Sequence, residues 1–168
     1  MKKLLLLALL LPLMISCTPT ELAPGEGIIS IEKDGKKWKG LEIDARFNSR
    51  IPDTWILTIS KEGNSNRLSE LLTFSNIPPK KGMHTIGRSI PGEEPEEIIF
   101  PAFGTLDYDI PIDNYSLEEN PENSFEISSF DPSTNEAIGS FRVTLFDGEG
   151  SDKKTITFTS DEFRVIVK

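Results

Sequence analysis

The C-terminal part of the chain alternates apolar and polar residues, which is the pattern of a half-buried β-strand. Two runs show it most clearly, FRVTL at 141–145 and FRVIV at 163–167. Turn-forming residues stand between such runs, with DPS at 131–133 and DGEG at 147–150. No convincing helical period of 3.6 residues occurs anywhere in 28–168. This pattern predicts an all-β domain.

The same reading extends to the rest of the body. We expect strands at 28–33, 36–47, 54–61, 67–77, 83–88, 98–110, 125–130, 137–146, 154–160 and 162–168. Asp34-Gly35 favours a two-residue hairpin turn, and LSELL at 68–72 leaves a helical turn open as an alternative. Residues 111–124 form the longest polar connection. About nine or ten antiparallel strands predict a β-sandwich or an up-and-down barrel, and the pattern does not choose between them.

The N-terminus predicts export and lipid attachment. Residues 1–16 read MKKLLLLALLLPLMIS, a positive start followed by an apolar run that is too short for a comfortable transmembrane helix. Cys17 follows at once, as in a bacterial lipoprotein signal; the alternative is an ordinary signal peptide followed by a chance cysteine. We therefore expect a signal peptide at 1–16, a lipidated Cys17 with a flexible tether at 17–27, and one β domain at 28–168. The membrane, reached through this anchor, is the first expected partner.

Composition excludes several functional classes. The chain has 18 Lys and Arg against 27 Asp and Glu, a formal net charge of −9, which argues against nucleic acid as a partner. A single Cys and a single His leave no disulfide framework within the chain and no zinc site built on several thiolates. We expect no cofactor.

Four short motifs carry a family resemblance: DGKKW at 34–38, KGMHTI at 81–86, IGSFRV at 138–143 and EFRV at 162–165. Together they resemble the uncharacterised small lipoproteins of the Bacteroidota, over most of residues 28–168. The sequence departs from that family at Asp161-Glu162, where a Gly often precedes the last strand. The resemblance implies a lipid-anchored β domain of unknown activity, and it carries no catalytic residues to this chain.

The tether also bears on location. In some lipoproteins of the Bacteroidota an acidic cluster directly after the cysteine directs the protein to the cell surface. Here Glu21 is the only acidic residue among the first four after Cys17. We therefore expect the outer membrane, with the domain facing the periplasm, and keep the cell surface as an alternative.

Exposed aromatic side chains are candidates for sugar binding, because sugar rings stack on aromatic faces. Trp38 and Tyr108 are the candidate ligand-binding residues. Trp55 is in phase with Leu57 and Ile59 and is expected in the core. Trp38 stands among lysines, so a solvated hairpin tip is the competing interpretation.

Acidic residues offer a calcium hypothesis. Asp107, Asp109 and Asp113 lie close together in sequence, and Asp107 and Asp109 would point to one face of a strand. Solvated loops in an acidic protein explain the same pattern, so we expect no metal site. His84, the only imidazole, stands at the start of a short strand and is not expected to be a catalytic base.

These observations predict a lipid-anchored, non-enzymatic envelope protein whose β domain binds or scaffolds another molecule, a glycan or an envelope protein. One alternative is a glycan-acting enzyme with two carboxylates facing each other across a groove. Another is a protein inhibitor or adhesin that presents an acidic loop, either IPGEEPEE at 90–97 or the connection 111–124.

Overall fold

The computed structural model describes residues 22–63, 68–88, 98–107, 110–148 and 153–168. The predicted signal peptide, Cys17, the acidic loop at 90–97, Tyr108 and Asp109 lie outside these residues. Within the described ranges, no helix is long and apolar enough to cross a membrane.

The described residues form twelve strands and no helix, so the predicted all-β class is confirmed. The strands are β1 (Gly27–Ile29), β2 (Ile31–Lys33), β3 (Lys36–Trp38), β4 (Glu42–Phe47), β5 (Trp55–Glu62), β6 (Leu68–Ile77), β7 (Gly82–Ile86), β8 (Ile98–Asp107), β9 (Ile110–Leu117), β10 (Ser124–Asp131), β11 (Glu136–Asp147) and β12 (Lys154–Ile166).

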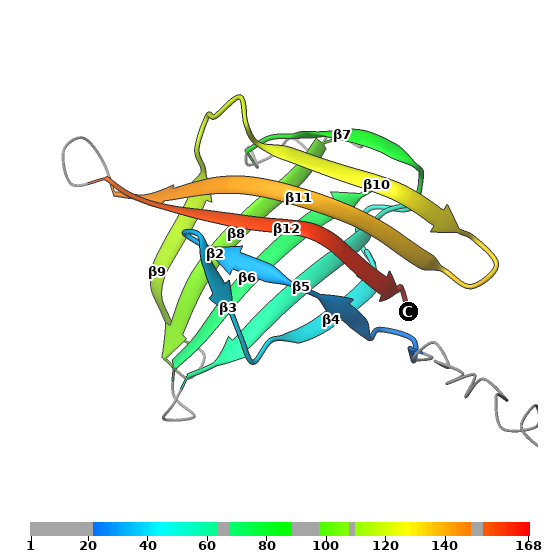
Figure 1. Cartoon of the computed structure of the whole chain (residues 1–168), viewed down its shortest axis with the longest axis horizontal. Coiled ribbons are helices and arrows are strands. Elements are labelled where there is room, and N and C mark those ends of the chain that lie inside the picture. Colours follow the sequence, from blue (N-terminus) through cyan, green and yellow to red (C-terminus); the bar gives the residue numbers. More distant parts are fainter. Residues whose placement is uncertain (1–21, 64–67, 89–97, 108–109, 149–152) are drawn as a thin grey trace, which may run out of the picture.

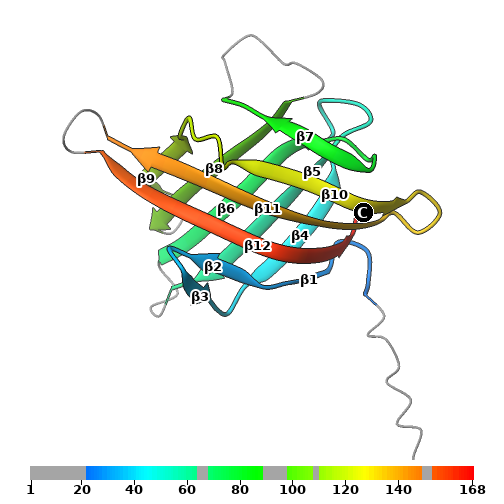
Figure 2. The ribbon, with the colours of Figure 1, turned by 45° about the horizontal axis from the view of Figure 1, so that its top comes forward.

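The strands are arranged in two layers. The first layer has the order β3-β2-β12-β11-β10-β7, with β1 also paired to β12. The second layer has the order β4-β5-β6-β8-β9. Figure 1 shows β10, β11 and β12 crossing the strands of the second layer, and Figure 2 shows the same crossing from another side.

Hydrogen bonds join the two layers at their edges. β9 pairs with both β8 and β11, and β7 pairs with both β10 and β8. On the opposite side, the amide of Ala45 donates to the carbonyl of Gly25, and the amide of Lys168 donates to the carbonyl of Ala45. The fold is thus a sandwich whose edges are joined as in a barrel, which leaves few unpaired strand edges.

Aromatic side chains from both layers fill the space between them. The ring centroids of Phe74 and Phe141 are 4.6 Å apart, and those of Phe103 and Phe158 are 4.9 Å apart. In each pair one ring comes from the second layer and the other from the first. Trp55 is fully buried, as its phase with Leu57 predicts. Burial of these large apolar surfaces is the main force that holds the two layers together.

The Asp34-Gly35 turn is confirmed. Lys33 pairs with Lys36 across it, and the backbone φ angles are 52° at Asp34 and 70° at Gly35. Both values are positive, as a type I′ turn requires.

Several predicted boundaries are wrong. The expected strands 154–160 and 162–168 are one strand, β12, which continues through a bulge: Phe141 faces Ser160 whereas Gly139 faces Phe163. The extra residue of the bulge shifts the alternation by one and imitates a strand end. The 28–33 and 36–47 segments each divide into two strands, and Gly40 with a φ of 71° lies in the second break.

Three further expectations need correction. The predicted connection 111–124 contains most of β9, in which Asn114 and Ser116 are exposed while Tyr115 and Leu117 are buried. LSELL is part of strand β6, so the helical alternative is wrong. The strands are also not all antiparallel, because β7 and β8 pair in parallel at Thr85 and Ile98.

Candidate functional site

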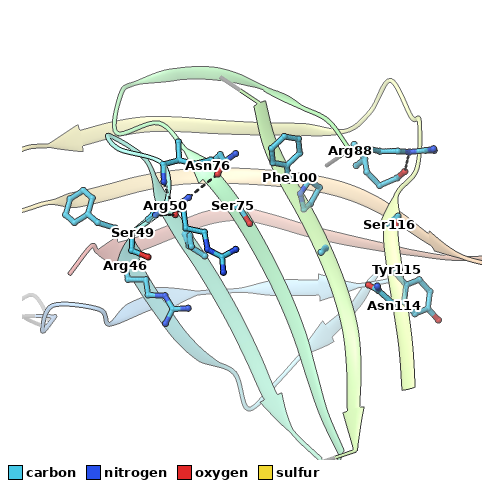
Figure 3. Close-up of a pocket in the computed structure, with 17 residues that line it drawn as sticks. Arg46, Ser49, Arg50, Ser75, Asn76, Arg88, Phe100, Asn114, Tyr115 and Ser116 are labelled. Atoms are coloured by element: carbon cyan, nitrogen blue, oxygen red, sulfur yellow. Dashed lines mark hydrogen bonds between the residues drawn. The ribbon is translucent and has the colours of Figure 1, made fainter. Parts of the chain in front are cut away.

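A groove of about 890 Å³ lies on the second layer, on the face that points away from the core. It extends from the end of β4 across β5, β6 and β8 to β9 (Figure 3). Its described lining includes three arginines, several Ser and Asn side chains and Phe100. The volume falls within the range of about 300–1,000 Å³ that is usual for ligand sites.

Strand alternation explains which side chains reach the groove. Ala45, Leu57 and Phe74 are fully buried, so their neighbours along each strand point outward. Arg46 faces Ile56 across β4 and β5, and Ser75 faces Phe100 across β6 and β8. These four outward side chains all line the groove: Arg46, Ile56, Ser75 and Phe100. Antiparallel pairing thus gives the groove a floor that is partly polar and partly apolar.

Two arginines occupy the β4 end. In Figure 3 the side chains of Arg46 and Arg50 extend over the same face of the sheet as Ser75. Arg46 lies 3.8 Å from Asp44 and remains 59% exposed. The other carboxylate oxygen of Asp44 is 2.5 Å from the ammonium of Lys168. Arg46 therefore has only a loose ion pair, and its guanidinium is accessible from the groove.

The loop that carries Arg50 is held by side-chain hydrogen bonds. The Asn48 carboxamide oxygen accepts a bond of 2.9 Å from the amide of Arg50, and its nitrogen donates at 3.1 Å to the side chain of Asn76 on β6. The Thr54 hydroxyl donates at 2.9 Å to the carbonyl of Ile51. These bonds fix the loop against the sheet, so the backbone at Arg50 is held in place before any ligand arrives.

The opposite end of the groove lies where β9 meets the first layer. The Arg88 Nε donates at 2.9 Å to the carbonyl of Leu117, and the guanidinium carbon lies 5.1 Å from the ring centroid of Phe146. Asn114 and Ser116 on β9 add polar side chains to the lining. This end therefore also combines a positive charge with groups that form hydrogen bonds.

Tyr115 lies between these two residues but is buried, and its ring packs 5.5 Å from that of Phe103. Burial raises the pKa of Tyr115, and the nearby charges of Asp113, Asp147 and Asp34 raise it further. Its phenol is therefore a neutral hydrogen-bonding group at physiological pH.

Trp38 lies in the core and not on an exposed platform, which corrects the prediction that it offers a face to a ligand. Only 5% of its surface is exposed, and its Nε1 donates at 2.8 Å to Glu70. The physical reason is its register: Trp38 faces the buried Ile31, whereas the lysines beside it point the other way.

Glu70 receives a second bond from the ammonium of Lys33, which also lies 4.8 Å from the ring centroid of Phe103. Burial alone would raise the pKa of Glu70. The hydrogen bonds from Lys33 and Trp38, with attraction to the charges of Lys33 and Lys61, outweigh burial and hold that pKa below its usual value. The carboxylate therefore stays ionised, and this cluster of Lys33, Trp38 and Glu70 is part of the structure at one end of the core.

The structure describes two of the three aspartates that the calcium hypothesis names. Asp107 ends β8 and faces Ile110, while Asp113 on β9 faces Thr105. Tyr108 and Asp109 belong to the residues that the structure leaves undescribed. In the described part of the chain, no group of three or more His, Cys, Asp and Glu side chains is placed to hold a metal ion. His84 on β7 donates from Nε2 to the carbonyl of Lys80 at 3.0 Å, and it is not part of the groove lining.

The groove residues were not predicted from the sequence. The available signal was the alternation of EIDARF at 42–47, which assigns Arg46 to the non-core face, whereas the continuous apolar run IIFPAF at 98–103 assigns Phe100 to neither face. What alternation does not give is the order of the strands, and that order brings the two residues onto one surface.

No protein-family model, no curated protein and no solved structure matches this chain. The resemblance to small lipoproteins of the Bacteroidota therefore stays a prediction.

Proposed function

We propose that this protein is a lipid-anchored, non-catalytic binding domain of the cell envelope, and that the groove on the second layer is its ligand site. The single observation that carries the proposal is the groove itself, an accessible hollow of about 890 Å³ that combines charged, polar and aromatic side chains. The anchor rests on Cys17 and the leader before it. The place of action we propose is the periplasmic face of the outer membrane.

The composition of the lining supports a polar ligand such as a glycan. Ser49, Ser75, Asn114 and Ser116 offer hydroxyl and amide groups that bond with sugar hydroxyls, and Phe100 supplies an aromatic surface. A sugar presents the same combination, with hydroxyls around its edge and apolar C–H groups on its face. Ligand sites generally join an apolar surface with a few well-placed polar groups in this way.

The lining also supports binding over catalysis. Among its described residues there is no carboxylate, imidazole or thiol, and acid–base hydrolysis of a glycosidic bond uses a pair of carboxyl groups. The titratable groups of the lining are arginines and the buried Tyr115, and an arginine stays protonated throughout the physiological range. The described groove thus offers groups that hold a ligand in place.

A groove-filling variant tests the proposal. Full-length protein in detergent is screened on a glycan array, and Ser75→Trp is compared with the wild type. We expect Ser75→Trp to abolish binding, because the indole would occupy the floor of the groove next to Phe100. Thr58→Trp is the control, since Thr58 also points outward from this sheet but does not line the groove. Equal binding by the wild type and Ser75→Trp, or no binding by the wild type, would contradict the proposed function.

A further inference from the structure

The arginines of the groove suggest what kind of ligand it takes. The whole chain has a formal net charge of −9, yet the described lining contains Arg46, Arg50 and Arg88 and no acidic residue. The groove therefore has the opposite sign to the molecule as a whole. Resting on the proposed function, we infer that the groove binds an acidic saccharide, a sugar carrying carboxylate or sulfate groups, with one such group held by Arg46 and Arg50.

Other arginines of the described chain have carboxylate partners. Arg142 lies 2.8 Å from Glu122, and Arg164 is paired with Glu136. Arg50, in contrast, has no ion pair among the described residues, and Arg46 has only the contact of 3.8 Å with Asp44. The positive charge at the β4 end of the groove is thus left largely uncompensated by the protein.

A guanidinium group is well suited to an oxyanion. Its planar set of N–H donors matches two oxygens of a carboxylate or a sulfate, and such charge-assisted bonds are stronger than neutral ones. The bond from the Arg50 amide to Asn48, and the bond from Asn48 to Asn76, hold the loop in place. Bringing two positive side chains over one face is unfavourable in the free protein, and a bound anion relieves that repulsion.

The rest of the groove fits the body of a saccharide. Ile56 on β5 and Phe100 on β8 provide the apolar surface of the groove, with Ser75 on the intervening strand β6 and Asn114 on β9 beyond Phe100. Arg88 adds a positive charge at the far end, where its Nε is already bonded to Leu117. An acidic oligosaccharide would place sugar rings on the apolar surface and negative groups towards both ends. The charge and the floor of the groove therefore point to the same ligand class.

The test compares matched probes that differ only in charge. Calorimetry with full-length protein in detergent uses trigalacturonate and its methyl ester for carboxylate, and 6-sulfated and unsulfated N-acetyllactosamine for sulfate. We expect at least one acidic probe to bind about tenfold more tightly than its neutral partner, because one added charge-assisted bond raises the affinity about tenfold. The affinity for that probe should fall as the NaCl concentration is raised. Whichever pair shows the difference identifies the acid group.

Arg50→Gln, which removes the charge and keeps most of the side chain, should reduce that affinity about fivefold or more while leaving the melting temperature unchanged. Arg142→Gln is the control, because Arg142 lies outside the groove and its partner Glu122 is exposed. Equal affinity for acidic and neutral probes would overturn this inference and leave the proposed function standing. Binding of none of the four probes would overturn the inference, and the glycan array then decides the proposed function separately. Tighter binding of a phosphopeptide than of either acidic sugar would also overturn it.

Discussion

The cluster of Lys33, Trp38 and Glu70 allows a quantitative test of how this fold is held together. Glu70→Gln is the sharpest perturbation, because it keeps the size of the side chain and removes its charge. In the wild type the two carboxylate oxygens accept separate bonds, one from Lys33 and one from Trp38 at 2.8 Å. The Gln amide has a single oxygen acceptor, so one of the two donors must face an NH₂ group.

The magnitude follows from the burial of the pair. A hydrogen bond to a charged group contributes about 1.5–3 kcal/mol to stability. The side chains of Lys33 and Glu70 keep 24% and 28% of their exposure, so solvent screening reduces the effect. We therefore expect Glu70→Gln to lower the free energy of unfolding by about 1–2 kcal/mol at pH 7. For a domain of this size that corresponds to a fall in Tm of about 3–6 °C.

The pH dependence gives a second readout. The folded-state pKa of Glu70 is lowered from 4.5, so its ionised form stabilises the protein above pH 4.5. That stabilisation is lost as the pH falls through the folded pKa. Gln has no charge to lose, so the difference in stability between wild type and variant should narrow in acid. Urea unfolding, followed by circular dichroism at pH 7 and at several pH values below 4.5, measures this difference in stability.

Glu126→Gln is the matched control, because Glu126 on β10 is exposed and should show neither effect. The reasoning fails if Glu70→Gln is within about 0.3 kcal/mol of the wild type at pH 7, a difference typical of a surface site. The reasoning also fails if the difference in the free energy of unfolding between the wild type and Glu70→Gln stays constant in acid.

Three further changes test other parts of the molecule. Cys17→Ala should release the protein from membranes and abolish labelling by radiolabelled palmitate, and unchanged labelling would refute the anchor. Gly139→Ala should destabilise by about 1–3 kcal/mol in urea unfolding, because the added Cβ would come 2.2 Å from the carbonyl oxygen of Glu126, whereas Ser140→Ala next to it should be nearly neutral. Asn48→Ala should cost more free energy of ligand binding than free energy of unfolding, since it frees the loop that carries Arg50. Equal losses of the two free energies would show that the loop matters only for folding.

Local pattern was enough to predict the fold class and parts of the core. Phe141, Val143 and Leu145 alternate with polar residues, and Trp55 is in phase with Leu57 and Ile59, so the segments themselves predict the burial of these side chains. The Asp34-Gly35 turn depends on backbone conformations that its own two residues favour. Such features need no knowledge of distant parts of the chain.

Trp38 shows where local pattern fails. Its lysine neighbours suggested a solvated tip, yet Lys37 faces Glu32 while Trp38 faces Ile31, so one strand presents charge outward and the indole inward. The partner that satisfies the indole N–H is the half-buried Glu70, on β6. This hydrogen bond offsets the cost of burying the indole N–H, and the partner that supplies it is far away in sequence.

The groove likewise depends on residues that lie far apart in the sequence. Arg46, Ser75 and Asn114 belong to β4, β6 and β9, and each of these strands alone shows only an outward polar residue. They share one surface because β5 lies between β4 and β6, and β8 lies between β6 and β9. A one-residue slip in the register of β6 would turn Ser75 inward and Phe74 outward, which would empty the core and block the groove together. The packing of Phe74 against Phe125 and Phe141 therefore fixes the floor of the groove from the opposite face of the sheet.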